Sequence, residues 1–456
     1  MSGIPLIITF VIAIALMIYA ISKLKIHPFL SIMAVSLLFG LVAGIPLADL
    51  PNVIGTGFSN TFKSIGIVII FGALIGTLLE KTGAALKMAD SVVRLVGKKN
   101  PELAMLLMGW IVSIPVFCDS GFVILNPIRK AMVKRTMRSS VASTVALSMG
   151  LYISHCFIPP TPGPIAAANT LYEGAGQGVN LLLVIMFGIL ASILPLIASY
   201  IFAISIGKRV KDREELGEDN DAEITQTYEE LVASYGKLPN AWLSFAPIVV
   251  PILLMSLSSA FAMAKLSVPV ITFFGTPIIA IAVGVLFALG VLVAQKRTGD
   301  FYELTNETLK IAGPILFITA AGGVLGNVIA NTSMVEFIKE NSTVLAAIGM
   351  MFPFLLSAIL KTAQGSSTVA ITTTAGIIAP MLTSIGLASP ALIALTVIAI
   401  GAGAMTVSHA NDSYFWVVTN FGNMKVEDGY KTQTLGTLVA GIASIINVYI
   451  IYLFIR

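Results

Sequence analysis

The chain has 456 residues, of which 57% are hydrophobic and only 11% charged, and its formal net charge is +4. A soluble globular domain carries about 25% charged residues, so this composition excludes a water-soluble fold and predicts an integral protein of the lipid bilayer. The excess positive charge lies in loops and indicates no nucleic-acid partner. The two cysteines, Cys118 and Cys156, form neither a zinc pattern nor a disulfide framework.

Several apolar runs are long enough to cross a bilayer as helices, which takes about 20 residues. The first run, 4–21, lacks a basic leading region and a clear cleavage site, so we expect a retained helix and not a cleaved signal peptide. Basic clusters follow the first and third runs, and the positive-inside rule places them in the cytoplasm. The order of membrane crossings inferred from these clusters puts both termini on the opposite side of the membrane.

The stretch 101–127 begins and ends at cytoplasmic basic clusters, yet it is apolar and is interrupted at 119–121, Asp-Ser-Gly. It must enter the membrane from the cytoplasm and return there. Polar backbone at membrane depth is tolerated only where it is buried in protein or lines a cavity. The stretch therefore predicts a re-entrant hairpin.

The next segment crosses outward from Ser139 and is interrupted near His155 and the proline-rich run 159–164, because proline removes backbone donors. The run 181–206 returns to the cytoplasm. A charge-dense interval follows, and its composition is typical of a solvated linker. These features predict an N-terminal membrane repeat, a cytoplasmic linker and a C-terminal membrane repeat, over residues 1–206, 207–241 and 242–456.

The second half can be threaded in the same way. Apolar crossings are expected over 242–264, 268–294, 313–330 and 435–454. The stretch 343–384 predicts a second hairpin, which is broken at 364–367 and enters from outside. The crossing 390–420 is interrupted near 409–412. The fold class is therefore an all-α polytopic membrane protein.

The two halves run in opposite senses in this threading. The glycine-rich run 72–76 echoes 322–326, and each polar break is followed by a Ser-His pair, at 154–155 and at 408–409. Together the echoes indicate an inverted-topology repeat, with a re-entrant hairpin and a broken helix in each half. Paired breaks of this kind indicate the binding site of a transporter.

Ionisable residues inside a membrane are costly, so each is a functional hypothesis. Asp119 lies among apolar residues at the expected hairpin tip. Burial favours the neutral carboxyl, which suits a group that takes up and releases a proton. Aspartate is also a common N-cap of a helix, and the two interpretations are compatible.

His155 and His409 lie beside the two other breaks. Histidine titrates near neutral pH and can relay protons. We favour a structural or substrate-contact role for both. No ligand spacing accompanies them, so neither a metal nor a cofactor is expected.

The second hairpin carries a polar cluster in which Gly365, Ser366, Ser367 and Thr368 precede or open the returning half-helix. Free backbone N–H groups and the helix dipole make such a start an anion site, and Ser120 with Gly121 does the same in the first hairpin. Small residues also serve ordinary helix packing in membranes.

The flanking Lys361 and Gln364 favour an anion site over simple helix packing in the second hairpin. Lys361 can instead extend to the membrane interface. Asn411 and Asp412 offer oxygen atoms for sugar hydroxyls, a sodium ion or a helix cap, and Thr161 is a weaker candidate. Motifs typical of hydrolases, zinc proteases or ATP-driven pumps do not occur, so we expect no enzyme.

Four motifs carry a resemblance to a known family. They are IPVFCDSGFVIL at 114–125, SH at 154–155 followed by PPTPGP at 159–164, AQGSSTVA at 363–370, and SHANDS at 408–413. In this order they resemble the gluconate permease family over essentially the whole chain.

The resemblance implies a bacterial inner-membrane symporter that imports gluconate or a related small hydroxy-carboxylate with protons. It further implies inverted repeats, a homodimer, elevator-like alternating access and, with the charge bias, periplasmic termini. Some relatives have Glu in place of Asp119 and His in place of Thr161. Members of the family carry gluconate, idonate, fructuronate or D-serine, so the substrate is expected by class only.

Together these arguments predict a substrate site with Asp119 as the proton-coupling carboxyl. The expected substrate contacts are Ser120, Gly121, His155, Thr161, Gln364, Gly365, Ser366, Ser367, Thr368, His409, Asn411 and Asp412. The alternative is a sodium-coupled carrier of carboxylates or D-amino acids. A passive channel would not accumulate its ligand, and a membrane enzyme would convert it.

Overall fold

The computed structural model describes residues 3–96, 100–136, 138–213, 238–263, 266, 268–334, 337, 348–410 and 412–455. These residues form helices and loops, with no strand among them. Seven helical segments in these ranges are long and apolar enough to cross a membrane, or eight if the bent helix α3 is one span. The all-α, polytopic fold class is thus confirmed.

The helices of the first half begin mostly where the sequence supplies a proline in the first turn or a capping side chain. They are α1 (Ile4–Ser22), α2 (Pro28–Ala43), α3 (Leu50–Lys81), α4 (Ala84–Val96), α5 (Pro101–Val112), α6 (Cys118–Thr136), α7 (Ser140–Phe157), α8 (Pro162–Gly174) and α9 (Leu181–Gly207). Helices α5 and α6 are the arms of the expected first hairpin, and α7 and α8 are the two parts of the expected broken crossing.

In the described part of the second half, a pair of helices and a broken helix follow one another in the same order as in the first. Its helices are α11 (Ala241–Met263), α12 (Pro269–Gly275), α13 (Pro277–Ala294), α14 (Phe301–Ala330), α17 (Met351–Gln364), α18 (Ser367–Ile378), α19 (Pro390–Met405), α20 (Ser413–Phe421), α21 (Val426–Gly429) and α22 (Leu435–Ile455). Three short turns of other helix types join them, at Thr298–Asp300, Ala379–Met381 and Tyr430–Thr434. The pair α17 and α18 corresponds to α5 and α6, and α19 with α20 corresponds to α7 with α8.

Three boundaries differ from the sequence-based expectation. The first hairpin turns at 113–117, so Asp119 lies in the first turn of α6 and not at the tip, and α6 continues past Pro127 to Thr136. Helix α14 begins at Phe301 and not at 313, because its first turns are polar and partly exposed, which hides them from a search for apolar runs. The expected crossing 268–294 is split into α12 and α13 at Thr276.

The start of the expected linker is not fully solvated. Asp212 is only 1% exposed, and the backbone N–H of Arg213 donates to the carbonyl of Asn423 at 3.0 Å. Positions 214–237 lie outside the described residues, as do 343–347 at the start of the second hairpin. The first linker residues therefore pack against the loop that follows α20.

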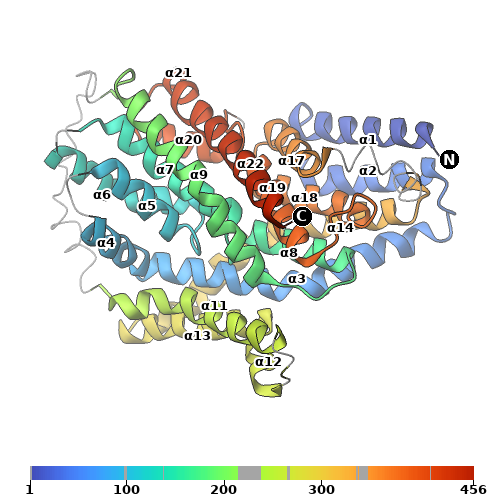
Figure 1. The fold of residues 1–456 in the computed structure, drawn as a ribbon, viewed down its shortest axis with the longest axis horizontal. Helices are drawn as coiled ribbons and strands as arrows, with labels where there is room; N and C mark the ends of the chain where they lie inside the picture. The colour runs from blue at the N-terminus through green and yellow to red at the C-terminus, as the bar shows by residue number, and fades with distance from the viewer. Residues whose placement is uncertain are drawn as a thin grey trace.

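Helices from the two halves contact each other. Helix α3 contacts α14, and α9 contacts α22; α9 and α22 run diagonally across the front of the molecule in Figure 1. Helices α11 and α13 form a pair beside α3, and α1 pairs with α2 near α17. The broken elements α7, α8, α18 and α19 lie between these outer helices and contact one another.

The two similar glycine-rich runs, 72–76 and 322–326, each allow a long helix to pack closely against a hairpin. A Cβ atom added to Gly76 in α3 would lie 2.5 Å from the carbonyl oxygen of Pro115, in the tip of the first hairpin. A Cβ atom on Gly326 in α14 would lie 2.4 Å from the carbonyl oxygen of Gly376, in the returning arm of the second. Small residues allow helices to pack this closely in membranes.

Candidate functional site

Residues from the four interrupted elements meet at one place. Asp119 at the start of α6 accepts a hydrogen bond from Ser413 Oγ of the second broken helix at 3.2 Å. Tyr152 Oη, on the first broken helix, lies 3.5 Å from Asp412 Oδ2. Lys361, on the second hairpin, forms an ion pair with the same carboxylate at 2.5 Å. The convergence unites residues that are far apart in the sequence.

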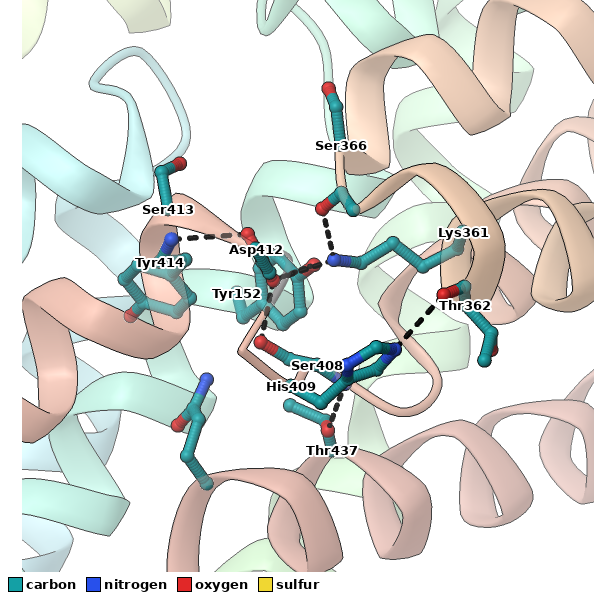
Figure 2. A network of polar contacts seen from close by, with 12 residues as sticks. Tyr152, Lys361, Thr362, Ser366, Ser408, His409, Asp412, Ser413, Tyr414 and Thr437 are labelled. Carbon is teal, nitrogen blue, oxygen red and sulfur yellow. Dashed lines mark hydrogen bonds and ion pairs between the residues drawn. The ribbon is translucent and has the colours of Figure 1, made fainter. Parts of the chain in front are cut away.

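The centre of the site is the ion pair between Lys361 and Asp412, shown in Figure 2. The Lys361 side chain is 0% exposed and that of Asp412 is 5% exposed. A buried charge is costly unless it is paired and hydrogen-bonded, and here each charge neutralises the other. The interpretation of Lys361 as a residue that extends to the membrane interface is therefore wrong.

The break between α17 and α18 explains the position of Lys361. It lies in the last turn of α17, and Gly365 ends that helix in the left-handed conformation at φ 91°, which favours glycine. The Lys361 ammonium also donates to the Gly365 carbonyl, and the Gly365 N–H donates to the Lys361 carbonyl at 2.9 Å. The turn thereby directs the lysine back across the end of its own helix.

Asp412 is the N-cap of α20, a position that aspartate favours. Its Oδ1 atom accepts the backbone N–H of Tyr414 at 3.0 Å. Its Oδ2 atom accepts from Lys361 Nζ and from Ser408 Oγ, both at 2.5 Å, and faces Tyr152 Oη. One oxygen thus anchors the helix start, and the other gathers donors from three elements (Figure 2).

Threonines of the last helical segment hold the second break in place. The backbone N–H of Ser408 donates to Thr437 Oγ1 at 2.9 Å, and Thr434 Oγ1 donates to the Ser408 carbonyl at 2.6 Å. Tyr414 Oη donates to the Ser148 carbonyl of α7 at 3.0 Å. The two threonine bonds satisfy backbone groups of Ser408, which lies outside regular helix, and the tyrosine bond ties α20 to α7.

His155 and His409 occupy different surroundings. His155 is 4% exposed, its ring is nearly parallel to that of Tyr152 with centroids 6.5 Å apart, and its Nδ1 atom has no hydrogen-bond partner among the described residues. His409 is partly exposed, and its Nε2 atom lies 2.9 Å from the Thr362 carbonyl. His409 therefore joins the second broken helix to the second hairpin.

The first hairpin contributes a less enclosed group. Asp119 is half-buried and is contacted by Cys118 Sγ at 3.6 Å as well as by Ser413. The Ser120 hydroxyl lies beside the Glu80 carboxyl of α3. Gly121 is buried, and a Cβ atom there would lie 2.7 Å from Leu151 Cδ2, so this glycine allows helix packing.

The hydroxyls of the second hairpin differ in their contacts. Ser366 is the N-cap of α18, and its Oγ atom accepts the backbone N–H of Val369 at 3.3 Å. Ser367 is buried and lies beside Tyr152 and Cys156, and Thr368 is half-buried. The Gln364 side chain and the whole of Asn411 lie outside the described residues.

Thr161 closes the first broken helix. Its hydroxyl donates to the carbonyls of His155 at 3.0 Å and Ile158 at 2.8 Å, and the residue is 1% exposed. The Thr161 hydroxyl is therefore engaged with backbone carbonyls at the break. Among the described residues, no three His, Cys, Asp or Glu side chains cluster in a way that could hold a metal ion.

Tyr152, Ser408 and Tyr414 are site residues that the sequence does not predict. One signal was present, because Tyr152 precedes His155 by three residues and so shares a face of α7 with it. Ser408 was noted only as part of a repeated pair. The contact of Tyr414 with Ser148 joins two segments that no local pattern relates.

Comparisons with known proteins agree with this architecture. Residues 4–454 match the model of the GntP family permeases. The chain is similar to an uncharacterized permease of Haemophilus influenzae, with 33% identity over 97% of this chain and 91% of the relative. It is also similar to a gluconate permease of Zymomonas mobilis, with 29% identity over 98% and 97%, and to the D-serine transporter DsdX of Escherichia coli K12, with 27% identity over 97% of both chains.

A solved structure shares the fold. The YdaH transporter of Alcanivorax borkumensis superposes with a TM-score of 0.65 over 94% of this chain and 99% of that one, at 15% sequence identity. At this identity the likeness concerns the fold alone.

Proposed function

The chain belongs to the GntP family of permeases, and from this premise we propose that it is a secondary active transporter that imports gluconate or a related small hydroxy-carboxylate with protons. The observation that supports this most directly is the convergence of residues from four interrupted elements around the buried pair of Lys361 and Asp412. Broken elements that converge on charged side chains are the construction expected of a transporter site.

The site has the chemistry to bind a hydroxy-acid. The starts of α6 and α18 present backbone N–H groups near Ser120 and Ser366, which suit an anionic group. The hydroxyls of the substrate would be contacted by the polar side chains predicted from the sequence. In this proposal those are Gln364, Ser367, Thr368, Asn411, Asp412 and the two histidines, with Gly121, Thr161 and Gly365 shaping the breaks.

Asp119 is the proposed proton carrier. It is half-buried and close to the ion pair through Ser413, so a proton can reach it and its charge acts on the site. With Lys361, Asp412 and Asp119 all ionised, the three groups carry a net charge of −1. One substrate anion that enters with one proton leaves that charge unchanged, which is favourable where charge is costly.

The proposed arrangement in the membrane follows from charge and from the repeated order of elements. The two halves, 1–206 and 242–456, would insert in opposite senses on either side of a cytoplasmic linker. The protein would act as a homodimer in the bacterial inner membrane, with periplasmic termini, and would expose the site alternately to either side.

Uptake by purified protein in liposomes tests the proposal. Labelled gluconate should accumulate under an inward proton gradient and not under a sodium gradient alone. Uptake that equilibrates without accumulation would indicate a channel, and recovery of a changed ligand would indicate an enzyme. If no hydroxy-carboxylate is taken up in larger amounts than by protein-free liposomes, the proposal is refuted.

A second candidate has support from the relatives, because D-serine transporters match the chain over nearly its full length. In this candidate the substrate is D-serine or a related carboxylate, and sodium replaces the proton, held near Asp412. A competition panel of gluconate, other sugar acids and D-serine under both gradients separates the two candidates.

A further inference from the structure

The Lys361 ammonium lies in a site that already receives a carboxylate. Its Nζ atom contacts Asp412 Oδ2 at 2.5 Å and the carbonyl of Gly365, and the side chain is fully buried. An unpaired ammonium in such a place is strongly destabilised, because it has lost its hydration and gained no counter-ion. A charged Lys361 therefore requires an anionic partner, and in this structure Asp412 is that partner.

We propose that Asp412 is a resident counter-ion that the substrate replaces. The carboxylate of an incoming hydroxy-acid takes the place of Asp412 Oδ2 at Lys361, which makes Lys361 the residue that selects an anionic ligand over a neutral one. This inference rests on the proposed function and specifies its substrate-binding cation.

The two oxygens of Asp412 explain how the exchange works. Oδ1 is held by the backbone N–H of Tyr414 at 3.0 Å and belongs to the cap of α20. Oδ2 is shared among Lys361, Ser408 and Tyr152, which come from the second hairpin, the second break and α7. The Lys361 ammonium and the Tyr152 hydroxyl can bind a substrate carboxylate in the same way, because it offers the same oxygen chemistry, while Ser408 stays with Asp412.

Asp412 keeps partners when Lys361 turns to the substrate. The hydrogen bonds from Ser408 Oγ and the Tyr414 N–H do not involve the lysine. The lysine lies at the end of α17, next to the hairpin turn, and the aspartate lies at the start of α20. The ion pair thus joins two broken elements, and its exchange would loosen that link only when a substrate anion is present.

A permanent structural ion pair is the alternative, and neutral replacements distinguish the two. Asp412→Asn keeps a side chain that caps helices well and removes the competing charge. Lys361→Met/Asp412→Asn removes both charges, which buried pairs often tolerate. Lys431→Met is the matched control, because Lys431 pairs with Asp428 at 3.0 Å on the surface, with 60% of its side chain exposed.

The experiment measures gluconate and gluconamide, its uncharged amide, by isothermal titration calorimetry on the detergent-purified full chain. We expect Asp412→Asn to bind gluconate at least about threefold more tightly than the unmodified protein. The double variant should lose at least about tenfold of the preference for gluconate over gluconamide, the effect of one charge-assisted hydrogen bond. Lys431→Met should keep the unmodified affinities.

The inference is overturned if Asp412→Asn binds gluconate no more tightly, or if the double variant keeps its preference for the anion. Should the double variant fail to fold, Asp412→Asn decides alone, through its affinity and through a larger rise in Tm on addition of gluconate. If the unmodified protein binds no hydroxy-carboxylate at all, the proposed function fails with it. Binding that the variants leave unchanged refutes the exchange only.

Discussion

The two hairpins look alike in sequence and differ in what they bury. The first brings Asp119 to a half-buried position, where Ser413 and Cys118 contact it. The second brings Lys361 into full burial against Asp412. A lone carboxyl can stay near the edge of the site, whereas an ammonium is buried here only with its counter-ion. Asp119 is therefore suited to proton exchange, and Lys361 is suited to anion binding.

Removal of the buried cation should have the largest effect. Lys361→Ala leaves Asp412 buried without its ion partner, which costs about 3–5 kcal/mol, and uptake should be lost. Thermal unfolding in detergent and gluconate uptake in liposomes measure both effects. Addition of Asp412→Asn to this variant should restore much of the stability, and a Tm that stays low would show that lost packing and not the unpaired charge is responsible.

The first hairpin should respond differently to neutralisation. Asp119→Asn is expected to insert in the membrane and to unfold within about 1 kcal/mol of the unmodified protein, because a partly exposed hydrogen bond contributes little. Proton-driven accumulation of gluconate should nevertheless be abolished. Full, pH-dependent accumulation by this variant would remove Asp119 from the proton pathway.

The close contacts behind each hairpin can be compared by Gly76→Ala and Gly326→Ala. Each added methyl group would overlap a backbone carbonyl, at 2.5 Å and 2.4 Å, so a loss of about 1–3 kcal/mol is expected for both. Gly290→Ala is the control, because nothing lies within 4 Å of its added Cβ atom. Equal Tm values for all three variants would show that the helices adjust freely behind the hairpins.

The smallest expected difference compares one chemical change at two places. Ser408→Ala removes a buried donor to Asp412 and should cost about 1–3 kcal/mol, whereas Ser413→Ala removes a more exposed donor to Asp119 and should cost about 0.5 kcal/mol. Thermal unfolding of both variants measures the difference. A larger loss for Ser413→Ala would reverse the assignment of burial to the two sites.

Much of the fold was accessible from the sequence because its signals are local. Long apolar runs, basic clusters and polar breaks predicted the order of helices, both hairpins and both broken crossings. The boundaries were less accessible where a helix has a polar, exposed start, as α14 does at Phe301, or where a polar residue follows the turn, as Asp119 does. In both cases the apolar pattern and the helix do not coincide.

The site was predicted in its parts and not in its pairing. Asp119, His155, His409 and Asp412 were singled out because polar residues in apolar sequence are conspicuous. Lys361 was noted, but its two possible environments could not be distinguished, and Tyr152 looked like any aromatic residue of an apolar helix. Burial decided the first case and proximity to Asp412 decided the second.

Composition and charge alone established a membrane protein of helices with two interrupted halves, because hydrophobicity acts on each segment separately. The pairing of charges came only from the tertiary structure. Lys361 meets Asp412 across 51 residues, and Tyr152 meets it across 260. Contacts over such separations depend on how all the helices pack, and they turn four separate breaks into one site with an acid near its edge and an ion pair at its centre.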